Sequence, residues 1–149
     1  MIPGVDDFNP RRLCRTALLL GAERLKILQK SHVLVVGLGG VGAYAAETIC
    51  RAGVGEMTIV DGDCVEESNL NRQLPALGTT IGKPKCAVVA SRLRDISPDV
   101  ILHPMHKFIR DEETDKLLAQ DFDYVVDAID TLSPKLNLII KAYNRNLPL

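Results

Sequence analysis

The sequence predicts an α/β protein in which helices cover both faces of a mostly parallel sheet. Short runs of apolar residues, typical of buried strands, alternate with longer stretches whose apolar residues recur at helical spacing. Such alternation favours parallel strands joined by right-handed helical crossovers. The first run, residues 33–36, leads into a G-x-G-x-x-G pattern and then into a helix. We therefore expect a Rossmann-like sheet, preceded by an N-terminal helical segment.

The composition is that of an ordinary globular domain. The chain has 149 residues, of which 46% are hydrophobic and 25% charged, and its formal net charge of −1 indicates no broad basic surface for nucleic acid. No apolar run approaches membrane-spanning length, so we expect no membrane partner. The four cysteines lack a C-x-x-C pair, which disfavours a zinc ribbon or disulfide framework and is typical of reduced thiols in a cytoplasmic protein.

Residues 10–29 form a predicted helical region, and Gly21 is expected to divide it into two pieces. Three of its apolar residues lie at spacings that allow them to share one face: Leu18, Leu25 and Leu28. We assign residues 1–30 to an N-terminal helical extension and residues 31–149 to the Rossmann-like domain.

The glycine pattern is the strongest local signal. It follows the β-branched run 33–36, and apolar residues at helical spacing come after it: Val41, Ala45 and Ile49. Glycines let the backbone approach a phosphate, and the N-terminus of a helix presents unpaired N–H groups with partial positive charge. The arrangement predicts a nucleotide site, and the alternative is a tight structural turn.

A second predicted strand, residues 57–60, ends at Asp61. This acid lies 24 positions beyond Gly37, close to the spacing at which a carboxylate reaches a ribose hydroxyl. The alternative is an aspartate that caps a turn. Residues 62–82 then form a long polar loop, and loops of this length in compact domains are usually functional or disordered.

A further helix opens at residues 83–85, with Pro84 suited to its first position. Its expected core face consists of Cys86, Val89, Ala90, Leu93 and Ile96. Lys85 is anomalous, because a cation in the first turn opposes the helix dipole. Either it is a solvated surface lysine, or an anion lies between its ammonium group and the helix terminus.

The remaining chain continues the alternation. Strands are predicted at residues 100–102 and 124–126, helices at 111–119 and 134–144, and the approach to one more strand at 146–149. Asp127 and Asp130 follow the buried strand 124–126, so they are expected at its carboxyl end, where open α/β sheets place their ligands.

These polar residues suit a reaction at phosphorus. If a carboxylate attacks the α-phosphate of ATP, Arg72 and Lys85 are placed to compensate the developing negative charge. Mg²⁺ prefers carboxylate and phosphate oxygens, and Asp130 is the first choice as its ligand, ahead of Asp127 and Asp63. A nicotinamide oxidoreductase would use the glycine turn and Asp61 but would leave the other side chains without a role.

Four separated motifs carry a resemblance to a known family. They are Gly37-Leu38-Gly39-Gly40-Val41-Gly42, Asp61-Gly62-Asp63, Ser68-Asn69-Leu70-Asn71-Arg72-Gln73 and Gly82-Lys83-Pro84-Lys85. This combination resembles the E1-like adenylating enzymes, which include ubiquitin-activating enzymes and activators of sulfur-carrier proteins. Within that superfamily the chain is most similar to the tRNA threonylcarbamoyladenosine dehydratases, from about Leu13 to its last residue.

The resemblance implies ATP-dependent adenylation of the carboxylate of N6-threonylcarbamoyladenosine in tRNA, followed by cyclisation with loss of AMP. It implies that the nucleotide is cradled by Gly37, Gly39, Gly40 and Gly42, and that Asp61 holds the ribose with Asp63 nearby. It also implies that the phosphates are contacted by Asn69, Arg72 and Lys85, and that Asp130 binds Mg²⁺. It also implies a homodimer, in which Arg15 loosely matches an arginine that reaches into the partner's ATP site.

Members of this family usually continue well past the point that matches Leu149. We therefore expect a piece of a longer protein, in which ATP binding survives and tRNA contacts come mainly from the missing region. Three alternatives stay open. They are an activator of a ubiquitin-like sulfur carrier, a nicotinamide oxidoreductase, and a nucleotide-binding or dimerisation module without catalysis.

Overall fold

The computed structural model describes residues 11–110 and 112–149. Its centre is a parallel sheet of four strands in the order β3-β2-β1-β4. In chain order the strands are β1 (His32–Val36), β2 (Glu56–Val60), β3 (Ile101–Met105) and β4 (Tyr124–Asp127). The helices that flank the sheet are α3 (Gly42–Ala52), α4 (Lys85–Ile96), α5 (Glu112–Leu117) and α6 (Leu132–Asn144).

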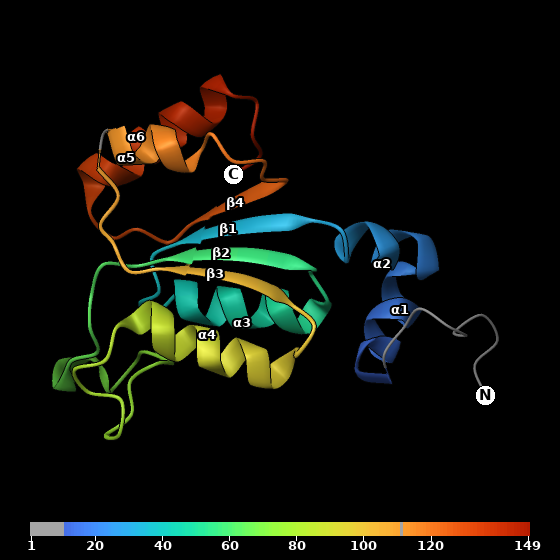
Figure 1. Cartoon of the computed structure of the whole chain (residues 1–149), viewed down its shortest axis with the longest axis horizontal. Coiled ribbons are helices and arrows are strands. Elements are labelled where there is room, and N and C mark those ends of the chain that lie inside the picture. The colour runs from blue at the N-terminus through green and yellow to red at the C-terminus, as the bar shows by residue number, and fades with distance from the viewer. Residues whose placement is uncertain (1–10, 111) are drawn as a thin grey trace.

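The helices form a layer on each side of this sheet. In Figure 1, α3 and α4 lie on one face, and α5 and α6 lie on the other. Each strand is joined to the next in the sequence by a crossover containing one of these helices, which accounts for the parallel pairing. The predicted α/β class, with helices on both faces of a parallel sheet, is confirmed.

Alternate residues of the strands supply two separate cores. Val33 and Val35 of β1 pack with Met57 and Ile59 of β2 against α3 and α4. Leu34 and its neighbours on the opposite face pack against α5 and α6, together with Phe122 and Leu138. Because successive side chains of a strand point to opposite faces, a central strand buried on both sides reads as the continuous apolar run seen at residues 33–36.

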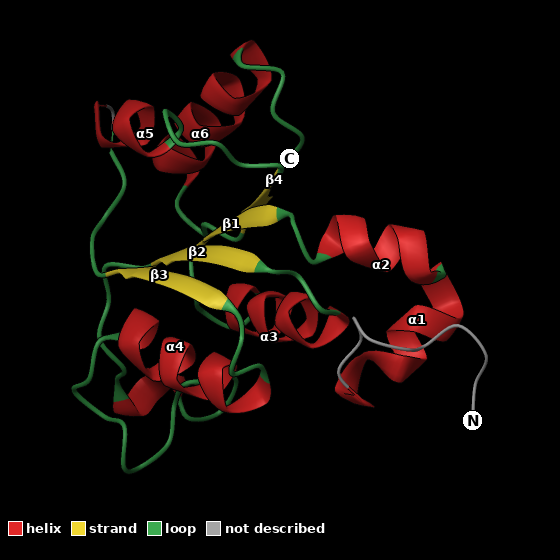
Figure 2. Ribbon diagram, turned by 45° about the vertical axis from the view of Figure 1, so that its right-hand side comes forward, coloured by secondary structure: helices red, strands yellow, loops and turns green. Residues whose placement is uncertain are grey.

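The N-terminal segment is helical and divided, as predicted. A 3₁₀ turn, η1 (Arg11–Leu13), leads into α1 (Cys14–Leu20), and α2 (Ala22–Leu28) follows Gly21, which adopts φ 80°. Figure 2 shows the two helices set at an angle beside the sheet. The predicted shared leucine face is wrong: Leu25 is 2% exposed but Leu18 is 57% exposed, because the bend at Gly21 breaks the helical phase between them. Residues 1–10 of the proposed extension lie outside the described residues.

The edges of the sheet differ from the sequence prediction. β3 extends to Met105, three residues beyond the predicted end, although it contains Pro104. An edge strand tolerates proline because one of its sides has no partner that needs the N–H. The strand at residues 124–126 was expected to be buried, but β4 is the other edge, and Tyr124 is 46% exposed.

Several predicted helix boundaries shift by a few residues. α4 begins at Lys85, so that Pro84 is its cap rather than its first residue. α6 begins at Leu132, and Pro134 lies in its first turn, where a missing N–H costs nothing. α5 spans a shorter range than predicted, and residue 111 lies outside the described residues. At the C-terminal end, the carbonyl of Pro148 accepts a hydrogen bond from the N–H of Val125, beside β4.

In the part of the chain that the structure describes, no helix is both long enough and apolar enough to cross a bilayer. All four cysteines are free thiols. Cys50 and Cys86 lie in the core, as predicted for Cys86, and burial raises the pKa of both thiols. Cys64 is exposed in the loop after β2.

Candidate functional site

A cleft of about 1170 Å³ opens at the carboxyl ends of the strands. Open α/β sheets bind their ligands at this end. α2 leads into the amino end of β1, so α1 and α2 lie at the other end of the sheet (Figure 1). The cleft brings together nine residues predicted from the sequence: Gly37, Gly39, Gly40, Asp61, Asp63, Asn69, Arg72, Lys85 and Asp130.

Two glycines of the turn after β1 are required by the protein's own packing. Gly37 adopts φ +91°, and a Cβ there would lie 2.5 Å from the carbonyl oxygen of Ala128. A Cβ on Gly42 would overlap the carbonyl oxygen of Gly37. Gly42 is buried beneath the turn and does not line the cleft, so its contribution to the site is the close packing of α3 against the turn.

Gly39 and Gly40 have no such requirement. The nearest atoms to a Cβ at these positions are Gln73 Nε2 at 3.8 Å and the Arg72 carbonyl oxygen at 3.7 Å, which are ordinary contacts. Both glycines line the cleft. The space beside this backbone is therefore left open, as the close approach of a phosphate requires.

Asp61 connects the glycine turn to the loop after β2. Its Oδ2 accepts a hydrogen bond from the N–H of Leu38 at 2.6 Å, and its Oδ1 accepts one from the N–H of Asp63 at 2.7 Å. The turn-capping role and the ribose role are compatible, because a carboxylate offers about four acceptor positions. Asp61 thus fixes the turn and still presents acceptor positions at the edge of the cleft.

Lys85 is the most deeply buried cation of the cleft. Its side chain is 6% exposed, and its Nζ donates to Oδ2 of Asp63 at 2.9 Å, whereas the Asp63 side chain is 54% exposed. The backbone N–H of Lys85 also donates to the Asp63 carbonyl at 3.0 Å. The alternative of a solvated surface lysine is therefore wrong. Asp63 holds the ammonium group in the first turn of α4, against the helix dipole.

The long loop presents Asn69 and Arg72. Asn69, 7% exposed, ends the 3₁₀ turn η2 (Glu67–Asn69), and its Oδ1 accepts the N–H of Glu66 at 3.1 Å. Arg72 Nη1 donates to the Ser68 carbonyl at 3.0 Å and to Asn71 Oδ1 at 2.9 Å. These bonds fix the guanidinium group, while the carbonyl oxygen and Cγ of Arg72 lie beside Gly40.

The two acids after β4 have different surroundings. Asp127 Oδ1 accepts the N–H of Ile129 at 3.0 Å, and its Oδ2 pairs with the ammonium group of Lys135. Asp127 does not line the cleft, and these contacts fix the turn that leads to Asp130. Asp130 is exposed, lines the cleft, and accepts a hydrogen bond from Thr131 Oγ1 at 3.2 Å. Asp130 and Asp63 are thus accessible carboxylates for a cation at this site, and the exposed Glu66 also lines the cleft.

Arg15 lies apart from the residues above. It is exposed on α1, at the opposite end of the sheet, and does not line the cleft of its own chain. Any contact between Arg15 and a nucleotide would therefore have to be made with the cleft of another copy.

The cleft also contains residues that the sequence reasoning missed. They are the segment after β3 and the start of α6: Lys107, Phe108, Ile109, Arg110, Ser133, Pro134 and Asn137. β3 was predicted to end at residue 102, so its carboxyl end was misplaced. The parallel alternation was a sufficient signal, because every carboxyl end of a parallel sheet meets the same edge.

One buried polar atom in the cleft lacks a partner. Among the described residues, Gln73 Oε1 is buried without a hydrogen bond, although Gln73 lines the cleft beside Gly39. Native structures rarely leave such atoms unpaired, so the atom suits a donor from a ligand. Cations and acids line the same cleft, which suits an anion of several charges together with a divalent cation.

Most of the chain is similar to known proteins. Residues 12–149 match the model of the ThiF family. The chain is 40% identical over 135 residues to the tRNA threonylcarbamoyladenosine dehydratase of Bacillus subtilis, covering 91% of this chain and 53% of that protein. It is 36% identical over 129 residues to the molybdopterin-synthase adenylyltransferase of Escherichia coli, covering 87% of this chain and 50% of the relative.

A solved structure is similar along most of the chain. It is the Escherichia coli tRNA N6-threonylcarbamoyladenosine dehydratase in complex with ATP, with a TM-score of 0.92 and 37% sequence identity, covering 93% of this chain and 57% of that one. The Rossmann-like fold and the resemblance inferred from the four motifs are thereby confirmed. The chain spans about half the length of the curated relatives it matches.

Proposed function

The chain belongs to the ThiF family, and we propose that it binds ATP in the cleft at the carboxyl ends of its strands and activates a carboxylate by adenylation. The observation that carries this proposal is the position of Arg72, Lys85 and Asp130 around one cleft, beside the open backbone at Gly39 and Gly40. A hydride-transfer enzyme would need the glycine turn but would have no use for two cations and an acid at this point.

The polyphosphate is proposed to lie along the glycine turn. The N–H groups at the start of α3 and the space beside Gly39 and Gly40 provide an anion site. Asp61 would accept the ribose hydroxyls. Gln73 Oε1, which lacks a donor, would accept a hydrogen bond from the substrate or from ordered water.

In the proposed reaction, a carboxylate oxygen of the substrate forms a bond to the α-phosphorus while the bond to the bridging oxygen breaks. Pyrophosphate leaves and an acyl adenylate remains. Lys85 and Arg72 would stabilise the charge that develops on the phosphoryl oxygens, and both are held by hydrogen bonds before the substrate arrives. Mg²⁺, held by Asp130 with Asp63 nearby, would neutralise phosphate charge.

We propose N6-threonylcarbamoyladenosine in tRNA as the substrate, with cyclisation of the adenylate and release of AMP as the second step. The support is the similarity to the Bacillus subtilis and Escherichia coli dehydratases, which extends over 91% and 97% of this chain. The described residues would provide the ATP site for such a reaction. The tRNA contacts are expected to involve surface beyond the matched half of these relatives.

The assembly that we propose is a homodimer in which Arg15 of one protomer reaches the cleft of the other. The supporting observation is the exposure of Arg15 on α1, away from the cleft of its own chain. A guanidinium group supplied in this way would add a third cation beside the leaving pyrophosphate.

Exchange of labelled pyrophosphate into ATP tests the proposal, measured on this chain and on a version that spans the full length of the matched relatives, with tRNA that carries the modified adenosine and with unmodified tRNA as the control. We expect exchange that depends on the modification. ATP binding without exchange would leave a nucleotide-binding module. Tighter binding of NAD than of ATP, indifferent to Arg72→Ala, would favour an oxidoreductase and overturn the proposal.

A second adenylation substrate has a specific observation in its favour. The chain is also 36% identical to a molybdopterin-synthase adenylyltransferase, over 87% of its length. An activator of a ubiquitin-like sulfur carrier would use the same nucleotide site. Pyrophosphate exchange that requires the C-terminus of such a carrier, and not modified tRNA, would select this alternative.

A further inference from the structure

Three side chains that the proposed function does not use gather on one face of the sheet. They are His32 of β1, Glu56 of β2 and His103 of β3. His32 pairs directly with Glu56 in the register of β1 and β2, and His103 lies opposite Thr58, two residues further along β2. Residues two apart in a strand share a face, so the three side chains rise from neighbouring strands on the same side.

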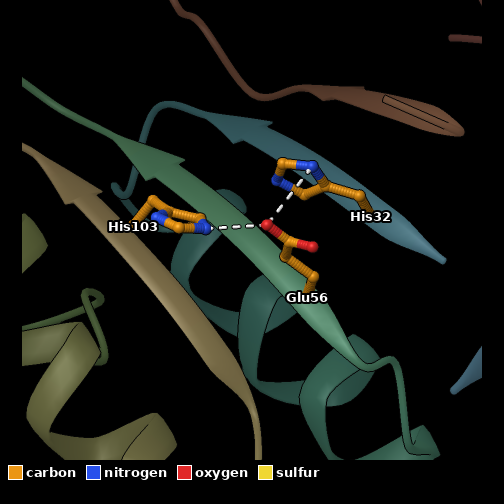
Figure 3. A group of neighbouring side chains, drawn as sticks. All are labelled: His32, Glu56 and His103. Atoms are coloured by element: carbon orange, nitrogen blue, oxygen red, sulfur yellow. Dashed lines mark hydrogen bonds and ion pairs between the residues drawn. The ribbon is translucent and has the colours of Figure 1, made fainter. Parts of the chain in front are cut away.

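The three side chains point toward one another in Figure 3, with the Glu56 carboxylate between the two imidazole rings. Glu56 Oε1 lies 2.8 Å from His103 Nε2 and 3.7 Å from His32 Nδ1. One ligand atom from each residue falls within 4.8 Å of the others. A tetrahedral zinc ion with bonds of about 2.0–2.1 Å separates its ligand atoms by about 3.3 Å, a value between the two observed distances.

From this geometry we infer a binding site for a divalent transition-metal ion of the zinc type. Two imidazoles and one carboxylate are ligands that Zn²⁺ favours, whereas Mg²⁺ and Ca²⁺ require oxygen ligands. The site provides three ligands and leaves a fourth position for water. The exposed fractions of the side chains, 14% for His32, 34% for Glu56 and 47% for His103, leave the ion a path from solvent.

His32 is held in place from several directions. Its ring packs against Phe122 with centroids 4.5 Å apart, and its backbone N–H donates to Asp123 Oδ2 at 2.7 Å. Its Nε2 lies 2.9 Å from Oγ1 of the fully buried Thr58. When Nδ1 binds the metal, Nε2 carries the proton and donates it to this hydroxyl oxygen, the outer contact that orients most metal-bound histidines.

Metal binding exchanges one set of contacts for another. Nδ1 of His32 lies 3.0 Å from the carbonyl oxygen of Asp121, which accepts a proton but cannot donate one. In the metal-free protein Nδ1 therefore carries the proton and is aimed at this carbonyl, so metal binding requires the ring to turn toward Glu56 and moves the proton to Nε2. His103 Nε2 likewise gives up its hydrogen bond to Glu56. The ion thus replaces the contacts of His32 with the Asp121 carbonyl and of His103 with Glu56 by a link across β1, β2 and β3.

The site lies away from the proposed nucleotide cleft. His32 and Glu56 are the first residues of their strands, whereas the cleft begins after the last residues. The separation along a strand of five residues is about 13 Å. The ion is therefore inferred to join the strands at the amino ends of β1 and β2 and to stabilise the fold, with no part in adenylation.

Calorimetric titration of the untagged, metal-free chain with Zn²⁺ tests this inference. We expect binding of a single ion and a rise in Tm on addition of the metal. His103→Gln and Glu56→Gln should each weaken binding at least about tenfold, the lower end of the loss seen when only an outer contact of a metal ligand is removed. Both residues are partly exposed, so the fold should survive, as far-UV circular dichroism would verify.

Two control variants separate this site from other zinc ligands. His106→Gln removes the remaining histidine of the chain, and Cys64→Ser removes an exposed thiol. Both should bind Zn²⁺ as the parent does. The inference would be overturned if the parent did not bind Zn²⁺, or if His103→Gln bound it as tightly as the parent. It would also be overturned if Cys64→Ser lost Zn²⁺ binding while Glu56→Gln retained it.

Thr58→Val tests the role of the buried hydroxyl group. Valine keeps the branched shape that suits a strand but cannot accept the Nε2–H of His32. We expect Zn²⁺ affinity to fall about 10- to 100-fold. Unchanged affinity would mean that Nδ1 of His32 is not the ligand, and the three-residue site would be wrong.

Discussion

The Nζ of Lys85 lies 2.9 Å from Oδ2 of Asp63, and the two side chains differ sharply in exposure, at 6% and 54%. The buried partner of this ion pair is the cation, at the start of α4, where the helix dipole opposes positive charge. Asp63 offsets that penalty in the absence of a ligand. An anion in the cleft would add a second counter-charge without requiring the lysine to move.

Lys85→Met should therefore abolish activation while leaving the fold intact. Methionine fills much of the volume of the lysine stem but provides no charge for the phosphoryl oxygens. We expect the rate of pyrophosphate exchange to fall by a factor of about 10²–10³, the usual cost of losing one donor to a developing oxyanion. Lys83→Met, an exposed lysine two residues earlier, is the matched control. Equal rates for both variants would remove Lys85 from the mechanism.

The glycines of the turn should respond to substitution in two different ways. Gly40→Ala places a methyl group at ordinary van der Waals distance from Arg72 and toward the cleft, so it should leave Tm nearly unchanged and weaken ATP binding. Gly42→Ala forces a methyl group into the carbonyl of Gly37 and should cost about 1–3 kcal/mol of stability or more. Thermal unfolding and ATP titration of both variants separate the effects. Full ATP affinity in a folded Gly40→Ala variant would contradict a phosphate beside this backbone.

Arg15 can be tested by complementation between two inactive variants. If Arg15 acts in the partner's cleft, Arg15→Ala and Lys85→Met should each be inactive alone. Mixing them should restore exchange, because a mixed dimer contains one cleft with an intact Lys85 and an Arg15 donated by the other protomer. Restoration should be absent if Arg15 has no part in the site, in which case Arg15→Ala retains parental activity.

The ion pairs that join α3 to α4 predict a pH-dependent contribution to stability. Hydrogen bonding to Arg92, and secondarily to Arg51, lowers the pKa of Glu47 in the folded protein, while burial opposes this effect. A carboxyl group whose pKa is lower in the folded than in the unfolded protein stabilises the fold at pH values above its unfolded-state pKa. This stabilisation is lost as the pH falls through its folded-state pKa.

Urea unfolding of the parent and of Glu47→Gln measures this contribution. We expect the parent to be more stable by about 0.5–1 kcal/mol at pH 7, a value limited by the exposure of both arginines, with the difference vanishing in acid. Glu67→Gln, an exposed glutamate of the polar loop, should show no comparable difference. A difference that persists in acid would show that packing, rather than charge, is responsible.

The central part of the fold could be predicted because its signals are local. Residues 33–36 form an unbroken β-branched run beside a glycine turn, and β1 differs from the prediction by one residue. Gly21 was sufficient to predict that the N-terminal helical region is divided into two helices. The leucine face could not be predicted, because the phase between Leu18 and Leu25 depends on the dihedral angles of Gly21 rather than on spacing.

The site was predictable where side chains belong to motifs beside strand ends. The sequence could not reveal the ion pair between Lys85 and Asp63. That contact depends on how the loop folds back, which involves an isolated antiparallel β-bridge between Cys64 and Pro84. Phe108 was missed because Pro104 obscured the end of β3, although the parallel alternation already indicated that this end meets the cleft edge of the sheet. The cluster of His32, Glu56 and His103 was missed for a related reason: its members are distant in the chain and meet through strand register.

The attack of a carboxylate on the α-phosphorus of ATP is tested most directly with an oxygen-18 label. Modified tRNA whose threonylcarbamoyl carboxylate carries the label is incubated with Mg²⁺, ATP and a version of the protein that spans the full length of the matched relatives, and the nucleotide products are examined by mass spectrometry. We predict AMP that contains a single labelled oxygen, together with unlabelled pyrophosphate, because the bridging oxygen of the adenylate leaves with AMP. Unlabelled AMP, or ADP and phosphate in place of AMP and pyrophosphate, would contradict adenylation at this site.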